Sequence, residues 1–114
     1  MQDCIFCRIV AGQIPAKKVF ESDEVLAFDD VSPVAPVHVL VVPKRHIETL
    51  NDASDSDAEL LGKLLLCAKT IASEKNLSQH GYRAVLNTMS GAGQAVFHVH
   101  MHVLGGRELR WPPG

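Results

Sequence analysis

The stretch VFHVHMHVLGG, residues 96–106, places His98, His100 and His102 at every second position, with one apolar residue between each pair. Because successive side chains of a β-strand point to opposite faces, this alternation predicts a strand with three imidazoles on one face and three apolar side chains on the other. We expect the apolar face to pack against a helix. The imidazole face then contacts water, holds a metal or performs catalysis.

The composition predicts a single globular domain over residues 1–114, with 46% hydrophobic and 21% charged residues. The formal net charge is −2, and the chain has no run of Lys or Arg, so neither nucleic acid nor a membrane is expected as a partner. The first residues, MQDCIFCRIV, contain no basic leader and no long apolar segment. We therefore expect a cytoplasmic protein.

Strand patterns occur in clusters that one long helical pattern interrupts. This arrangement favours an α+β fold with an antiparallel sheet over repeated βαβ units. Ser56 and Glu59 have the spacing of a capping box before the long helix, and Asp3 is placed to cap a short first helix. The expected helices span residues 4–12 and 57–75, and the expected strands span residues 18–22, 24–30, 37–43, 82–87 and 96–105.

A catalytic zinc held by the three alternating histidines is one interpretation, since His₃ zinc sites exist. This interpretation leaves Cys4, Cys7, His38 and His46 unexplained. The loop at residues 88–95 also has the character of a phosphate site rather than a metal site. Its glycines allow close approach of backbone N–H groups to an anion, and nearby amide side chains add neutral donors; these residues are Gly91, Gly93, Gln94 and Asn87.

Nucleophilic catalysis at phosphorus is a further interpretation of the histidine row. An imidazole with an ordinary pKa near 6.5 is an available nucleophile at neutral pH, and a neighbouring imidazolium can donate a proton. Phosphoryl transfer depends mainly on positioning and on stabilisation of charge, which clustered histidines and backbone donors provide without a metal.

The sequence HVHMHVL resembles the H-φ-H-φ-H-φ-φ signature of the histidine triad (HIT) family, where φ is an apolar residue. The segments at residues 14–47, 86–106 and 111–114 are similar to the Hint branch of that family, the purine nucleoside phosphoramidases. This resemblance implies a HIT-like fold, a five-stranded antiparallel sheet with two helices. It also implies a homodimer in which two sheets join into ten strands.

The resemblance also implies catalytic roles. His100 would attack the α-phosphorus of a nucleoside 5′-phosphoramidate such as AMP-NH₂ or AMP-lysine, forming a nucleotidyl-histidine that water hydrolyses to AMP. His102 would contact the phosphate and help to protonate the leaving amine. His38 would be a further hydrogen-bonding member of the site.

Nucleotide contacts follow from the same resemblance. Asp30 would hold the ribose hydroxyls, although it has an alternative role as a turn cap, and Trp111 would reach the site of the partner subunit. Ala95 stands where Hint proteins commonly carry a serine that contacts phosphate. Phe28, Val31, Leu40 and Ile9 would line the purine slot, and Asn87, Gly93 and Gln94 would surround the phosphate.

Cys4 and Cys7 form a C-x-x-C that offers a separate, structural zinc site. Other members of the HIT superfamily complete such a site with a distal histidine and the first histidine of the triad, which here implies His46 and His98. A redox pair and two buried core thiols are the alternatives for the two cysteines. Cys67 lies in an apolar helical stretch and is expected in the core.

The predicted function is hydrolysis of purine nucleoside phosphoramidates, with zinc as a structural cofactor and no cofactor needed for catalysis. Two alternatives remain. One is a dinucleoside polyphosphate hydrolase of the Fhit type, and the other is a non-catalytic module that binds purine nucleotides or zinc.

Overall fold

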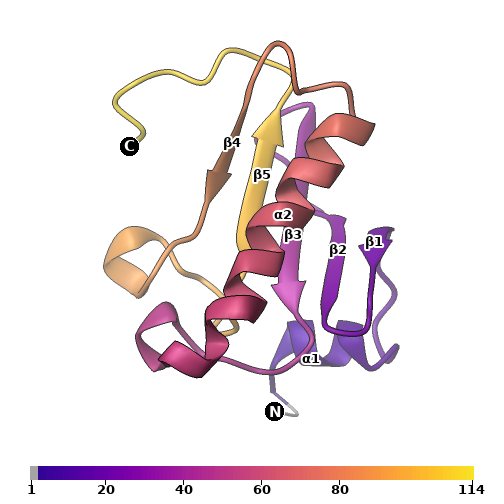
Figure 1. The fold of residues 1–114 in the computed structure, drawn as a ribbon, viewed down its shortest axis with the longest axis vertical. Coiled ribbons are helices and arrows are strands. Elements are labelled where there is room, and N and C mark those ends of the chain that lie inside the picture. Colours follow the sequence, from indigo (N-terminus) through magenta and orange to yellow (C-terminus); the bar gives the residue numbers. More distant parts are fainter. Residues whose placement is uncertain (1–2) are drawn as a thin grey trace.

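The computed structural model describes residues 3–114, which form one five-stranded antiparallel sheet and two α-helices (Figure 1). The strand order is β1-β2-β3-β5-β4, so β3 and β5 are neighbours although 57 residues separate the end of one from the start of the other in the chain. The α+β class and the antiparallel sheet are therefore confirmed. The elements are α1 (Ile5–Val10), β1 (Lys18–Glu21), β2 (Val25–Asp29), β3 (Val37–Pro43), α2 (Ala58–Glu74), β4 (Tyr82–Val85) and β5 (Met101–Gly105).

The two faces of the sheet bury different clusters. Val39 and Val41 of β3, together with Met101 and Val103 of β5, pack against α2 in the larger core cluster. The opposite face carries a smaller cluster in which α1 packs against β2 and β3; its buried members are Phe6, Ile9, Leu26, Phe28, Leu40 and Val42. Because β-strand side chains alternate, His38 and His102 lie on this second face, away from the long helix.

Helix α2 forms as its apolar periodicity predicts, and it buries Leu60, Leu64 and Ile71 against the sheet. Its cap differs from the expected one. The backbone N–H of Ser54 donates to the Asp57 carboxylate at 2.9 Å, so the cap forms two residues before the predicted pair and encloses a short 3₁₀ turn. No helix in residues 3–114 combines the length and the apolar character needed to cross a bilayer.

The prediction that Asp3 caps the first helix is wrong, because Cys4 occupies the cap position. The Cys4 Sγ accepts a hydrogen bond from the Cys7 N–H at 3.2 Å. A thiol is a weaker acceptor than a carboxylate, so another interaction must favour cysteine here. The cap places the two sulfur atoms on the same side of the helix start.

The predicted strand at residues 96–105 is only half correct. Regular pairing begins at Met101, and residues 96–100 form an irregular segment that approaches the loop after β3. There the backbone N–H of Val99 donates to the carbonyl of Ile47 at 2.7 Å. His98 and His100 therefore do not share a strand face with His102, and each ring takes a separate environment.

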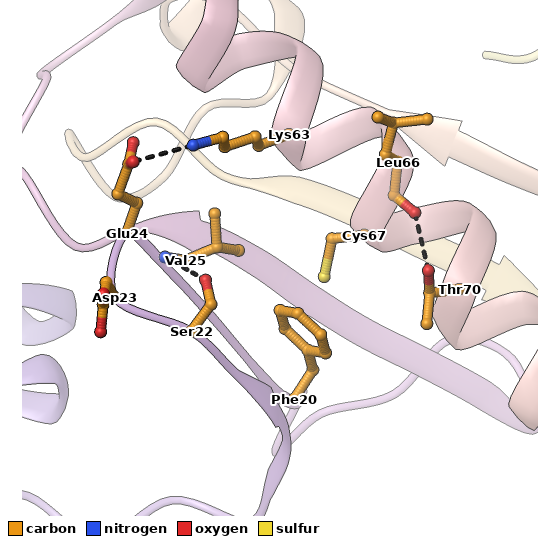
Figure 2. A pocket seen from close by; sticks show the side chains of 9 residues that line it. All are labelled: Phe20, Ser22, Asp23, Glu24, Val25, Lys63, Leu66, Cys67 and Thr70. Atoms are coloured by element: carbon orange, nitrogen blue, oxygen red, sulfur yellow. Dashed lines mark hydrogen bonds and ion pairs between the residues drawn. The ribbon is translucent and has the colours of Figure 1, made fainter.

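The β1–β2 turn packs against α2 away from the histidines. Lys63 of α2 donates to Glu24 of the turn at 2.8 Å, and Cys67 lies below this ion pair beside Phe20 and Val25 (Figure 2). These residues line an open cavity of about 410 Å³. Because Lys63 and Glu24 are both well exposed, we attribute the contact between the β1–β2 turn and α2 mainly to apolar packing rather than to the ion pair.

We expect Leu64→Ala to lower the free energy of unfolding by about 2–5 kcal/mol, because Leu64 is completely buried between α2 and the sheet and its truncation leaves a cavity. Leu66→Ala, on the same helix but 63% exposed, should change it by less than about 0.5 kcal/mol. Urea unfolding measures both variants. Equal losses would contradict the assignment of this helix face to the core.

Candidate functional site

His100 is held in a single tautomer by its own segment. Its Nδ1 lies 2.8 Å from the backbone carbonyl of His98, and a carbonyl can only accept, so Nδ1 carries the proton and donates. The lone pair of the neutral ring is therefore on Nε2. Because the ring is buried and its Nδ1 is fixed, His100 presents an oriented nitrogen nucleophile.

His38 and His102 form a directed pair on neighbouring strands. The backbone N–H of Val34 donates to His38 Nδ1 at 3.1 Å, which places the proton of the neutral ring on Nε2. His38 Nε2 lies 2.9 Å from His102 Nδ1 and donates to it. The proton of neutral His102 is then on its own Nε2. The ring centroids of His100 and His102 are 5.1 Å apart, so the ring of His102, with its Nε2–H, lies beside the nucleophile.

The pKa of His102 is lowered to about 4, chiefly by burial and further by His100 and His38. The ring is therefore neutral at pH 7 when no ligand is bound. A phosphate anion beside the ring would favour the charged form and raise this pKa.

Asp30 serves both the turn and the histidine pair. Its Oδ1 accepts a hydrogen bond from the Ser32 N–H at 2.8 Å, which is the turn cap named above as its alternative role. Its Oδ2 lies 3.3 Å from His38 Nε2. The carboxylate is thus oriented from both sides at the end of β2, and its predicted contact with ribose stays a prediction.

A cavity of about 500 Å³ opens beside Asp30, with mostly apolar walls. The structure brings together here all the residues predicted to form the purine slot: Ile9, Phe28, Val31 and Leu40. Val31 is 97% exposed, so it stands at the mouth rather than in the wall. The size and the apolar lining suit a flat aromatic ring with a polar group at one end.

Sequence reasoning missed Phe6 of α1. Its ring meets Phe28 edge-on with the centroids 5.6 Å apart, and it meets His100 at 5.1 Å. Phe6 thus connects the apolar cavity to the nucleophile and limits the tilt of the imidazole. Its position three residues before Ile9, on the same helix face, is the signal that could have identified it.

The loop before the histidines is organised differently from the expectation. The Gln94 Oε1 accepts from the Met89 N–H at 2.8 Å, and its Nε2 donates to the carbonyls of Glu48 and Val96. The backbone N–H groups of Gly93 and Gln94 are also used inside the loop. Gln94 therefore shapes the loop here, and its phosphate contact stays a prediction.

The other predicted ligand-contacting residues have the following places. A Cβ at Gly93 would lie 3.6 Å from Asn87 Nδ2, so these two residues are neighbours. Ala95 is exposed at the end of the same loop. Trp111 is 82% exposed in the C-terminal tail, where it lines none of the cavities described here. Its predicted role toward a partner subunit is untested by a single chain.

Cys4, Cys7, His46 and His98 come together although they are far apart in the sequence. Their ligand atoms lie within 4.8 Å of one another, with 3.2 Å between the two histidine Nδ1 atoms and 3.2–3.5 Å for three sulfur–nitrogen pairs. In a tetrahedral zinc site with bonds of about 2.05 Å to nitrogen and about 2.3 Å to sulfur, two nitrogens are separated by about 3.3 Å and a nitrogen and a sulfur by about 3.6 Å. The four atoms have the spacing of a zinc ligand set.

The protonation of this cluster also suits a metal. His98 Nε2 donates to the backbone carbonyl of Pro43 at 2.8 Å, which leaves the Nδ1 lone pair facing the cysteines. Burial lowers the pKa of His98, so its ring is neutral. Burial also raises the pKa of the Cys7 thiol to about 11, and Cys4 adds to the rise. A metal would have to displace the thiol protons, which makes binding depend on pH.

Asp30, His38 and His102 form a second group with metal-ligand spacing, but their hydrogen bonds oppose a metal. His38 Nδ1 already accepts from Val34, so its Nε2 has no lone pair in the neutral ring. Coordination through Nε2 would require either an imidazolate or loss of the Val34 bond. The two groups thus differ in chemistry, and only the cysteine-containing one fits a metal.

The cavity beside Cys67 is a poor candidate for catalysis. Burial raises the pKa of this thiol to about 11, so it is not a thiolate at neutral pH (Figure 2). No histidine lines the cavity.

The low pKa of His102 predicts that its ring stays neutral well below pH 6.5 in the folded protein. We expect its NMR ring resonances to keep their neutral positions from about pH 7.5 to about pH 5, whereas the same ring in urea-unfolded chain titrates near pH 6.5. Because the unfolded state binds this proton first, the contribution of His102 to stability is complete above about pH 6.5 and falls as the pH approaches 4. Titration of the folded ring near pH 6.5 would contradict its burial.

Comparisons with known proteins agree with this geometry. The HIT domain family model matches residues 11–109. A HIT-like protein of Synechococcus elongatus is 51% identical over 113 residues, which cover 99% of this chain and 98% of that protein. A HIT family hydrolase from Legionella pneumophila superposes with a TM-score of 0.97 at 53% identity, over 98% of this chain and 100% of that one. A histidine triad protein from Clostridium difficile superposes with a TM-score of 0.93 at 45% identity, over 96% of each chain. The chain thus belongs to the HIT domain family.

Proposed function

We propose that this protein hydrolyses purine nucleoside 5′-phosphoramidates, of the type AMP-NH₂ or AMP-lysine, through a covalent nucleotidyl-histidine. The observation that carries the proposal is the tautomer of His100, whose Nδ1 bond to the His98 carbonyl leaves Nε2 as the nucleophile. The name of the Legionella pneumophila relative, a HIT family hydrolase, supports the reaction class. A protein that only bound nucleotides would not need an oriented nucleophile.

In the proposed first step, the Nε2 lone pair of His100 forms a bond to the α-phosphorus, and the phosphorus–nitrogen bond of the substrate breaks. The bound phosphate anion favours the charged form of His102, whose ring lies beside His38, and the departing amine takes the Nε2 proton of this imidazolium. Water then attacks the phosphorus and returns a proton to His102 as the bond to His100 breaks, which releases AMP. His100 returns to its starting form.

Recognition of the nucleoside is assigned to the apolar cavity and Asp30. A purine fits between Ile9 and Leu40, with the Asp30 carboxylate accepting hydrogen bonds from the ribose hydroxyls. Asp30 Oδ1 accepts from Ser32 and Oδ2 lies 3.3 Å from His38 Nε2, and each carboxylate oxygen keeps a lone pair for a ribose hydroxyl. In this proposed orientation the 5′-phosphate would face the histidines.

The proposal includes a homodimer. Within residues 3–114, β4 is an edge strand of the sheet and pairs only with β5. An edge strand presents unpaired backbone groups that a second copy can satisfy, which would extend the sheet to ten strands. The exposed Trp111 would then be available to the site of the partner.

We also propose that Cys4, Cys7, His46 and His98 hold one zinc ion with a structural role. When bound, the metal would join α1 to the loop after β3 and to the segment before β5. Because the carbonyl of His98 also orients His100, a fixed His98 stabilises the geometry of the nucleophile. Four protein ligands leave no open position for substrate, which is typical of structural zinc.

His100→Ala should abolish release of AMP from adenosine 5′-phosphoramidate, with a loss of at least about 10³-fold, because it removes the proposed nucleophile. His80→Ala, an exposed loop position, is the matched control and should keep wild-type turnover. Wild-type turnover should persist in EDTA. A folded protein that binds AMP but turns over no phosphoramidate would contradict the proposal and favour the binding module.

Untagged protein purified without chelators should contain about one zinc per chain, and Cys7→Ala should contain less than about a tenth as much. Cys67→Ala is the control, since Cys67 lies in the α2 core and should not affect metal content. Elemental analysis measures all three. A wild-type protein without zinc, or equal loss in the control, would contradict the assigned ligands.

A further inference from the structure

A second cavity, of about 450 Å³, adjoins the proposed nucleotide pocket and has no role in the reaction as described so far. Ile5 and Val96 line both cavities, so the two share a wall. Ala95, at the end of the loop assigned to phosphate, lies on the second cavity as well. A ligand with its base in the first cavity and its phosphorus at this loop therefore has the second cavity beside its remaining substituent.

The second cavity also lies close to the nucleophile. His46 lines it, and His46 Nδ1 is 3.2 Å from His98 Nδ1. The carbonyl of His98 in turn accepts the bond from His100. Two residues thus form a continuous set of contacts between the cavity wall and the attacking ring.

The charge of the cavity is negative. Asp3 and Glu48 both line it and are exposed, and no lysine or arginine of residues 3–114 forms an ion pair with either. A zinc ion bound by two thiolates has no net charge, so the neighbouring metal site would not cancel the carboxylates. A cation entering the cavity would meet no competing positive side chain among the described residues.

The cavity also offers an apolar surface to a cation. Phe97 is 41% exposed and Ile5 is 45% exposed, although both are large apolar side chains. An aromatic ring next to carboxylates suits an ammonium group at the end of an alkyl chain, because the methylenes pack on the apolar side chains and the charge faces the carboxylates. A neutral alkyl chain would gain only the first of these contacts.

We propose that this cavity binds the leaving amine and selects amines that carry a second, positively charged ammonium group, with Glu48 and Asp3 as the specificity-determining residues. The inference rests on the proposed phosphoramidase function and names its substrate class. The preferred substrates are then nucleoside phosphoramidates of diamines or of lysine-like side chains.

Two synthetic substrates test the selection. One is the adenosine 5′-phosphoramidate of 1,5-diaminopentane, and the other is that of n-hexylamine, in which a methyl group replaces the distal ammonium. The readout is the ratio of their kcat/KM values, which cancels effects common to both. We expect the wild-type protein to prefer the charged substrate by roughly threefold or more, as is typical for exposed charge pairs, and the preference to weaken in about 0.5 M salt.

The Asp3→Asn, Glu48→Gln double variant should bring this ratio to within about twofold of one, while Glu48→Asp, which keeps the charge, should retain the preference. Glu74→Gln removes one carboxylate from the last residue of α2, which does not line the cavity, and should leave the ratio at its wild-type value. Thermal unfolding checks that each variant is folded.

The outcomes separate the two proposals. Turnover of unsubstituted AMP-NH₂ with a wild-type ratio near one, or with a ratio that the double variant leaves unchanged, would overturn the selection by charge and leave the phosphoramidase proposal standing. No turnover of any phosphoramidate, AMP-NH₂ included, would overturn both. A ratio that falls equally in Glu74→Gln would assign the preference to overall charge instead of the cavity.

Discussion

The pairing of β3 with β5 is the constraint on which the rest of the structure depends. Val39 lies opposite Val103, and both point into the core under α2. Since side chains alternate along each strand, the same register places His38 and His102 together on the other face. One set of backbone hydrogen bonds therefore buries the core and joins two strands at the candidate site. A shift of one residue in this register would exchange the two faces and destroy both.

The tautomers and orientations of the histidine rings depend more on hydrogen bonds to backbone groups than on other side chains. The carbonyls of Pro43 and His98 accept from His98 and His100, and the Val34 N–H donates to His38. Each of these bonds selects one tautomer and leaves a particular nitrogen for chemistry. The three histidines of the row therefore have different roles: His98 faces the cysteines, His100 presents Nε2, and His102 accepts from His38. Because the selecting groups belong to the main chain, the tautomers persist as long as the fold does.

Much of this arrangement was predictable from local patterns. The apolar periodicity of α2 and the alternating strands determined the fold class, and the C-x-x-C spacing of the two cysteines indicated a candidate metal site. The predicted caps were wrong at Asp3 and Ser56, because cap positions depend on where the preceding chain arrives; here the Cys7 N–H donates to Cys4 and the Ser54 N–H donates to Asp57. The role of Gln94 could not be predicted either, since its partner Glu48 lies 46 residues away in the chain.

The sequence by itself determined the class of fold, the set of histidines and cysteines available for chemistry, and the face of β5 that is apolar. These features follow from the hydrophobic periodicity and the residue types, which depend only on near neighbours in the chain. The family resemblance implied that His98 joins His46 and the two cysteines, and the tertiary structure brings these four residues together; only the tertiary structure decided that the regular strand begins after His100. The physical reason is that residues 96–100 satisfy their backbone by meeting the loop after β3, through the bond from Val99 to Ile47, and that loop is 52 residues away in the chain. No pattern among near neighbours in the sequence predicts such a contact.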